Sequence, residues 1–170
     1  MNLLRGLPGH PFHPPLTATT IGAYTFATAM AVLSKLGVSE HNTATAWWLA
    51  VVAGLVFTIP TAITGFADWL YIESGTPLWR TATIHLSVMV AATVVFAVTA
   101  GAGHGDYTDG SVGGGSLVLT LVGYGLLATG GWLGGAIVFT HGMRVLKLVD
   151  EPTGRAVSPL PKPEKEEAEA

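Results

Sequence analysis

Apolar residues fall into four long runs separated by short polar or glycine-rich stretches. A helix needs roughly 20 apolar residues to cross a bilayer, so each run is long enough to span a membrane. We place the four spans at about 16–36, 43–71, 78–100 and 116–148. The pattern predicts an all-α, four-helix transmembrane bundle formed by residues 1–150. An acidic tail at 151–170, dominated by Pro, Glu, Lys and Ala, is predicted to be disordered.

Local residue choices refine these boundaries. Pro14 and Pro15 suit the start of the first helix, and Pro60 is expected to bend the second. Segment 101–115, rich in glycine, is predicted to be a flexible surface loop. The first run has no small-residue cleavage site, so we expect a retained span and not a removable signal peptide. Aromatic pairs typical of membrane interfaces flank the second run, at Trp47, Trp48, Trp69 and Tyr71.

Composition supports a membrane protein and narrows the chemistry. Charged residues make up 11% of the chain, against about 25% in a soluble domain. The absence of cysteine excludes disulfides, thiolate-bound metals and covalently attached c-type haem. There is no basic face suited to nucleic acid. The partner that the composition predicts is therefore the lipid bilayer, and any cofactor must be held by nitrogen, oxygen or methionine sulfur.

The distribution of basic residues predicts the orientation in the membrane. Four spans place both ends of the chain on one side, and of the eight Lys and Arg residues only Lys35 falls on the other side. Because cytoplasmic segments carry an excess of Lys and Arg, we predict that both termini are cytoplasmic.

Four histidines are expected at one depth near that side. His85 lies five residues beyond Arg80, roughly 8 Å into the third span at 1.5 Å per residue. His141 reaches a similar depth in the fourth span. Ionisable residues are costly within a membrane and are functional candidates by default. The same layer also receives His10 and His13 ahead of the first span and Asp68 at the end of the second.

Imidazoles at one level predict a cofactor site. We identify His85 and His141 as an axial pair for b-type haem, in a protein that passes electrons near the cytoplasmic face. Gly130 and Gly134 are on the same stripe of the fourth helix as His141 and could leave room for a flat macrocycle. His10 and His13 would then form a second ligand set or a lid.

Two other interpretations remain open. One divalent ion such as zinc, copper or iron could be bound by His10, His13, His85 and His141, with or without Asp68. The carboxylate of Asp68 could instead form a salt bridge with Arg80 or Arg144, or orient a histidine. Alternatively, the protein is a structural or assembly subunit whose histidines only tie helices together. Two glycine steps, Gly130/Gly134 and Gly131/Gly135, predict close helix packing, either within the bundle or between protomers of a homo-oligomer. No catalytic motif is present, so enzymatic activity stays open.

Several motifs together resemble a known family. They are Gly9-His10-Pro11-Phe12-His13-Pro14, Gly65-Phe66-Ala67-Asp68-Trp69, His85, Gly131-Trp132-Leu133-Gly134-Gly135 and His141-Gly142. The chain resembles, over about 7–145, the bacterial membrane family labelled "domain of unknown function 2231". The resemblance implies a four-helix protein of the bacterial inner membrane. Some relatives resemble fusions with a Rieske iron–sulfur domain, which implies a redox partner protein. Many relatives carry an acidic residue where this chain has Ala136.

Overall fold

Four long helices form the molecule in the computed structural model, which describes residues 3–7, 9–146 and 149–158. They are α1 (His13–Lys35), α2 (Glu40–Trp69), α3 (Pro77–Ala102) and α5 (Gly114–Gly135), and a π-helical turn, η2 (Ala136–Thr140), continues α5. Three short helices complete the fold: η1 (Leu3–Arg5), α4 (His104–Asp109) and α6 (Thr153–Ala156). The all-α prediction is confirmed, since the only β feature of the described residues is an isolated bridge between Leu7 and His10.

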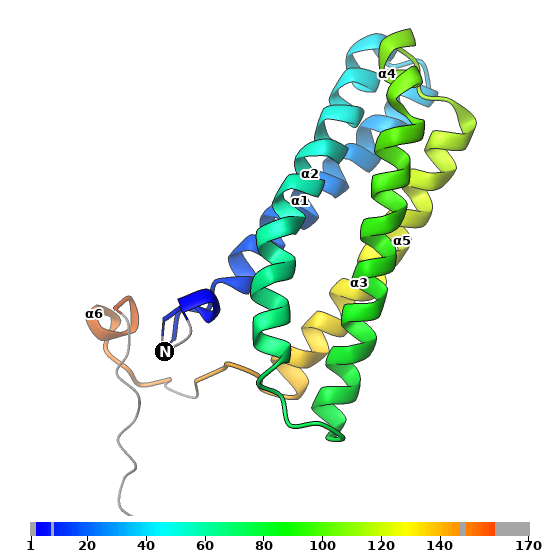
Figure 1. The fold of residues 1–170 in the computed structure, drawn as a ribbon. Helices are drawn as coiled ribbons and strands as arrows, with labels where there is room; N and C mark the ends of the chain where they lie inside the picture. The colour runs from blue at the N-terminus through cyan, green and yellow to red at the C-terminus, as the bar shows by residue number, and fades with distance from the viewer. Residues whose placement is uncertain (1–2, 8, 147–148, 159–170) are drawn as a thin grey trace, which may run out of the picture.

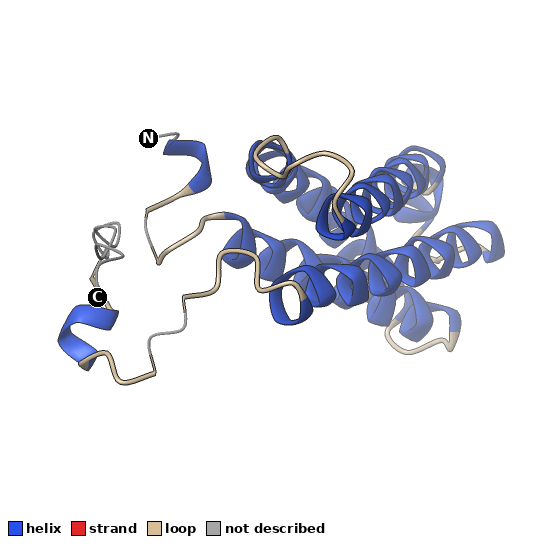
Figure 2. Ribbon diagram, turned by 90° about the horizontal axis from the view of Figure 1, so that it is seen from below, coloured by secondary structure: helices blue, strands red, loops and turns tan. Residues whose placement is uncertain are grey.

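The long helices run up and down as two hairpins (Figure 1). We call α1–α2 the first hairpin and α3–α5 the second. The N-terminal segment and α6 lie at one end of the bundle, the terminal end, and α4 lies at the other, the loop end (Figure 1). Seen from below, the N-terminal segment and α6 lie to one side of the long helices (Figure 2). Both ends of the described chain therefore meet at the terminal end, as an even number of spans requires.

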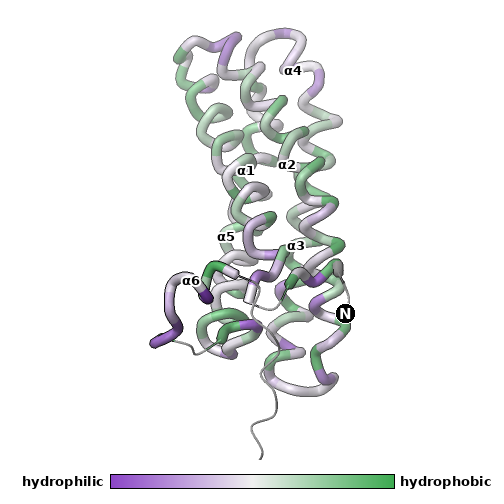
Figure 3. The backbone as a smooth tube through the Cα atoms, turned by 90° about the vertical axis from the view of Figure 1, so that its left-hand side faces the viewer, coloured by the Kyte–Doolittle hydropathy of each residue, from purple (hydrophilic) through white to green (hydrophobic). Residues whose placement is uncertain are grey.

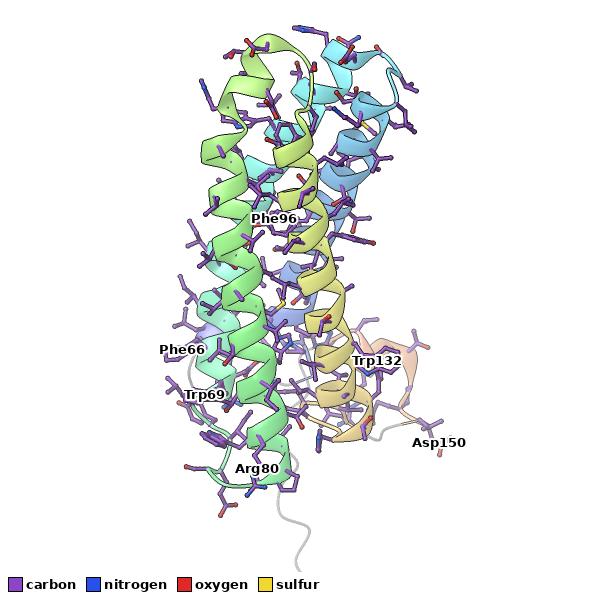
Figure 4. The ribbon with its side chains drawn as sticks, turned by 90° about the vertical axis from the view of Figure 1, so that its right-hand side faces the viewer. Phe66, Trp69, Arg80, Phe96, Trp132 and Asp150 are labelled. Atoms are coloured by element: carbon purple, nitrogen blue, oxygen red, sulfur yellow. The ribbon has the colours of Figure 1, made fainter. Side chains whose placement is uncertain are left out.

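The four long helices are long and apolar enough to cross a membrane. Hydrophobic residues run along their lengths, and hydrophilic residues gather at the two ends of the bundle (Figure 3). Many large apolar side chains face outward, including Trp132 of α5, which is 83% exposed (Figure 4). Outward apolar surface of this extent is expected where lipid, and not water, surrounds the helices.

Three segments differ from the expectations. The predicted flexible loop instead contains α4, where the Gly113 N–H donates to Asp106 Oδ2 at 2.8 Å and Trp48 stacks on Tyr107. The fourth helix ends at Thr140 and not near 148, because Gly142 and Arg144 adopt left-handed φ angles of 68° and 63° that turn the chain. In the tail, 153–156 form α6, and the prediction of disorder for 159–170 lies outside the described residues.

The main apolar core lies in the loop-end half of the bundle. The rings of Tyr24 and Phe96 stack at the base of this half with centroids 3.8 Å apart. Phe96 lies well inside the bundle in Figure 4, whereas Arg80 marks the terminal end. Buried hydroxyls occur in both halves, but the buried carboxylate among the described residues, that of Asp68, lies in the terminal half, where the histidines also lie.

Candidate cofactor site

His13 and His85 occupy matching places at the terminal end, one in each hairpin. His13 lies at the start of α1 with its ring against Gly65 of α2, and a Cβ on that glycine would come 2.6 Å from His13 Cε1. His85 of α3 lies against Gly134 of α5 in the same way, at 3.3 Å from such a Cβ. Each imidazole is thus seated where the partner helix has no side chain.

The same nitrogen is anchored in both rings. His13 Nδ1 lies 3.0 Å from the carbonyl oxygen of Thr61, and His85 Nδ1 lies 2.9 Å from that of Gly130. Each of these carbonyls belongs to the residue four positions before the glycine under the ring. A carbonyl only accepts hydrogen bonds, so Nδ1 carries the proton in both rings and Nε2 keeps its lone pair. Protein imidazoles that bind metals are oriented by this kind of bond.

The other nitrogen, Nε2, is unengaged in both rings. Within the part of the chain that the structure describes, neither His13 Nε2 nor His85 Nε2 makes a hydrogen bond, and neither is a fully enclosed unpaired atom. Both residues are half-buried, and the two imidazoles lie within electrostatic range of each other. The arrangement presents two nitrogen lone pairs at one level of the bundle.

The likeness of the hairpins extends to the loop-end half. Tyr24 and Phe96 follow His13 and His85 by eleven residues each, close to three helical turns. Their rings lie over Gly54 and Gly123, where a Cβ would come within 2.5 Å of Tyr24 and 3.0 Å of Phe96. These glycines precede Gly65 and Gly134, again by eleven residues.

A single arrangement therefore occurs twice. In each hairpin the first helix carries a histidine and an aromatic ring, and the second carries a glycine beneath each of them. The two aromatic rings stack on each other where the hairpins meet. The hairpins thus behave as approximate halves facing a shared centre, with the two histidines as equivalent residues.

Asp68 anchors the two terminal segments beside this site. It is buried at the end of α2, with Arg5 Nε at 2.8 Å and Arg144 Nη1 at 3.6 Å from its Oδ1. Arg144 Nη2 also donates to the carbonyl of Arg5, and the Arg5 guanidinium lies 4.0 Å from the centre of the Tyr71 ring. Asp68 is also within electrostatic range of His13. The carboxylate is thus engaged by two arginines.

His141 has a different environment from His85. It follows η2, is exposed, and its Nε2 lies 3.1 Å from the hydroxyl of Thr81. Thr81 precedes His85 by four residues, so His141 borders the site from outside. His10 lies in the N-terminal segment, where its backbone pairs with Leu7. His10 also takes part in a further interaction.

The residues predicted to surround one ion do not form a compact ligand set. No group of three or more His, Asp or Glu side chains in the described ranges is arranged to bind a metal ion. His13 and His85 lie in different hairpins within electrostatic range of each other, Asp68 is engaged by arginines, and His141 contacts Thr81. A pair of imidazoles is what the described residues bring together.

The glycines of α5 divide into two faces. Gly130 is buried against Met89, where a Cβ would come 2.3 Å from the thioether sulfur, and Gly134 lies under His85. Around Gly131, by contrast, there is open space within 4 Å. The Gly130/Gly134 step thus packs inside the bundle. The Gly131/Gly135 step faces outward, and a homo-oligomer through it stays a prediction.

One arginine of the site agrees with an expectation from the sequence and the other was not predicted. Of the two salt-bridge partners expected for Asp68, Arg144 lies 3.6 Å from its Oδ1, whereas the structure shows no ion pair with Arg80 among the described residues. Arg5, the closer partner at 2.8 Å, was not expected. A signal existed: Asp68 is the only acidic residue between Glu40 and Glu73, and a carboxylate at the edge of a span needs a cationic partner.

Four apolar helices of spanning length define a multi-pass membrane protein. The chain belongs to the family described as "Predicted membrane protein (DUF2231)", which it matches over residues 9–147. This confirms the resemblance noted in the sequence. Comparison with curated proteins and with solved structures finds no significant match.

Proposed function

We propose that His13 and His85 together bind one b-type haem near the terminal end, and that the protein passes electrons across or along that face of the membrane. The observation that carries the proposal is the matched anchoring of the two rings. Each Nδ1 is bound to a backbone carbonyl, at 3.0 Å in His13 and 2.9 Å in His85, and neither Nε2 makes a hydrogen bond to the described residues. Two axial imidazoles oriented by backbone carbonyls suit a low-spin haem.

His13 replaces His141 as the partner of His85 in this proposal. His141 is exposed and its Nε2 lies against the Thr81 hydroxyl, whereas His13 shares the seat and the backbone anchor of His85. Each hairpin would supply one imidazole from an equivalent position. His141 and His10 would then lie outside the axial set.

The number of ligands favours a macrocycle over a bare ion. Structural ions such as zinc need four protein ligands, and catalytic ones three. The described residues offer two imidazoles and no group of three. Two are sufficient for haem, because the porphyrin supplies the remaining four nitrogens.

The chain's own residues would orient and protect such a group. Gly65 and Gly134 set the position of each ring, and Thr61 and Gly130 fix which nitrogen is free. The Tyr24–Phe96 stack closes the space toward the loop end. Haem iron carries one electron by alternating between ferric and ferrous states. We place the terminal end at the cytoplasmic face of a bacterial inner membrane, where a soluble redox protein could reach it.

A structural role is the second candidate, and the same hydrogen bonds favour it. His13 ties α1 to α2 and His85 ties α3 to α5 through backbone carbonyls. If the two imidazoles only link helices, the protein binds no haem and the Nε2 atoms have no functional role.

Two substitutions separate these roles. The side-chain amide of Asn can occupy the place of Nδ1 and keep the bond to the carbonyl, but nothing then replaces Nε2. Gln extends to the place of Nε2 and leaves the carbonyl without its donor. The cofactor role predicts that His85→Asn abolishes haem binding while the apoprotein stays folded. The structural role predicts that His85→Gln lowers the melting temperature more than His85→Asn, with no spectral consequence.

The first test is a reduced-minus-oxidised visible spectrum of the protein purified in detergent after expression with a haem precursor. A sharp α-band of low-spin b-type haem, with one haem per chain, is expected. A featureless spectrum at full haem supply would rule out the proposal.

A further inference from the structure

An open pocket of about 410 Å³ lies at the terminal end, apart from the two histidines. Its walls come from three separate segments: the N-terminal segment supplies Arg5, the α2–α3 turn supplies Tyr71 and Thr76, and the segment after η2 supplies Arg144. Segments far apart in the sequence are thus assembled into one depression.

The two arginines are held in place at this pocket. The Nε of Arg5 is paired with Asp68, and the guanidinium lies over the Tyr71 ring. The two terminal amino groups of Arg5 have no partner in the described parts of the chain. Arg144 reaches Asp68 and the Arg5 carbonyl from a left-handed backbone. Such a backbone is uncommon for a residue other than glycine, and the bonds to Asp68 and Arg5 hold it.

The charge of this cluster suits an anion. Two guanidinium groups against one buried carboxylate leave a net charge of +1, and Glu73 on the pocket wall is exposed to solvent. The paired amino groups of an oriented guanidinium match two oxygens of a phosphate. The Thr76 hydroxyl already donates to the Glu73 carbonyl and accepts from the Trp79 N–H, so the arginines are the available donors.

The remaining walls indicate where the phosphate comes from. Ile72, Leu78 and Met143 line the same pocket, and Leu70 and Tyr71 beside it are about 60% exposed on the bundle surface. Inorganic phosphate has no apolar part that could contact these walls, whereas a phospholipid has acyl chains that could. Basic pockets at the ends of spans are known to take anionic headgroups.

We infer that Arg5 and Arg144 form a binding site for the phosphate group of an anionic phospholipid, with Asp68 and Tyr71 positioning the Arg5 fork and Ile72, Leu78 and Met143 contacting the apolar part of the lipid. The site is independent of the proposed haem, since neither histidine takes part in it. Lipid binding would tie the two terminal segments to the bundle at the membrane surface.

The test uses the full chain, stripped of lipid in detergent. It is titrated with short-chain phosphatidylglycerol, with short-chain phosphatidylcholine and with inorganic phosphate, while native mass spectrometry counts the bound molecules and the melting temperature is followed. One saturable phosphatidylglycerol per chain is expected, with weaker binding of the other two. Equally tight binding of inorganic phosphate would overturn the lipid assignment, and equally tight binding of phosphatidylcholine would overturn the selectivity for an anion.

Paired variants test the residues. Arg5→Gln alone would leave Asp68 short of a partner, so it is combined with Asp68→Asn, which keeps the net charge of the cluster at +1 and removes only the oriented fork. Loss of a charged hydrogen-bonding group predicts binding about tenfold weaker. Arg144→Gln should weaken binding further, because Arg5 and Asp68 then cancel.

Arg80→Gln is the matched control, since Arg80 is exposed at the same end but outside the pocket. It should bind phosphatidylglycerol as the unchanged protein does. Wild-type affinity in a folded Arg144→Gln protein, or in the Arg5→Gln/Asp68→Asn protein, would contradict the proposal.

Discussion

The two hairpins share their glycines, histidines and stacked rings but differ in the residues that complete each contact. In the first hairpin, the hydroxyls of Thr20 and Thr61 lie 2.9 Å apart. The matching positions in the second hairpin, counted from the same histidine and glycine, are Ala92 and Gly130. Where α1 and α2 are joined by a hydrogen bond, the matching positions of α3 and α5 carry small residues without a hydroxyl.

The aromatic level shows the same exchange. The Tyr24 hydroxyl lies 3.0 Å from that of Thr58, whereas Phe96 has no hydroxyl and the position matching Thr58 is the buried Leu127. Within each hairpin the two residues match in polarity: Tyr24 is paired with a hydroxyl, and Phe96 has an apolar residue at the corresponding position. What the hairpins share lines the centre between them, and what differs is compensated locally.

One difference is not compensated within a hairpin. Asp68 and Ile137 each follow the glycine under the histidine by three residues, and both are buried. Asp68 takes its partners, Arg5 and Arg144, from outside both hairpins. The ion pairs that fasten Arg5 and Arg144 to the bundle are therefore made by the first hairpin.

The largest loss of stability is expected from Asp68→Ile, which gives the first hairpin the residue that the second has at the matching position. Two partly buried arginines would lose their carboxylate, and breaking a buried ion pair costs about 3 kcal/mol or more. Because the two arginine side chains are 22% and 25% exposed, we expect a loss of about 2–3 kcal/mol in the free energy of unfolding, measured by denaturant titration in detergent.

The triple variant Arg5→Gln/Asp68→Ile/Arg144→Gln is the control for this change, since it removes the unpaired charges as well. It should recover most of the loss. No recovery would show that the cost comes from packing at this position and not from charge.

An intermediate effect is expected from glycine substitutions beneath the stacked rings. A Cβ at Gly54 would come 2.5 Å from the Tyr24 ring, and one at Gly123 would come 3.0 Å from the Phe96 ring. Overpacking of a core typically costs 1–3 kcal/mol, so we expect about 2–3 kcal/mol for Gly54→Ala and about 1 kcal/mol for Gly123→Ala. Gly131→Ala, which meets open space, is the control and should change the free energy of unfolding little. Equal losses of stability for the two variants would contradict a closer ring contact at Gly54 than at Gly123.

The smallest loss of stability is expected from Phe96→Tyr, which tests whether Phe96 and Leu127 correspond to Tyr24 and Thr58. Phe96→Tyr gives the second hairpin a hydroxyl but leaves Leu127 where Thr58 stands in the first. An unpaired buried hydroxyl costs about 1–2 kcal/mol, seen as a lower melting temperature. Adding Leu127→Thr should restore part of it, because a partner returns, although the lost apolar contact limits the gain. If the second change only lowers stability further, the correspondence of these positions is wrong.

The sequence predicted the helices better than the site. Long apolar runs are enough to locate four spans. Counting residues from Arg80 and Arg144 places His85 and His141 at similar depths, and His13 lies just ahead of the first span. Depth does not give the direction in which a side chain points. The pairing of His141 with His85 was based on matched depth. Placing His141 on the same stripe as Gly130 and Gly134 assumed 3.6 residues per turn, but η2 is π-helical over Ala136–Thr140. A wider turn rotates every later residue about the helix axis, which is consistent with His141 facing Thr81.

Some of the missing information was present in the sequence. An eleven-residue spacing separates His13 from Tyr24 and His85 from Phe96, and it also separates the two glycines of each hairpin. Aligning the two halves of the sequence on this spacing shows that the hairpins are alike. The ion pair of Asp68 with Arg5 could not be found in this way. It is accompanied by a tertiary contact across 139 residues, in which Gly142 and Arg144 turn the chain back toward Arg5.

The most direct test of the account compares His13→Asn, His85→Asn and His141→Asn by reduced-minus-oxidised visible spectra under equal haem supply. Equivalent histidines predict that the first two variants lose the low-spin α-band to the same extent and that His141→Asn keeps it. A band that survives in His13→Asn and disappears in His141→Asn would contradict the pairing of the two hairpins.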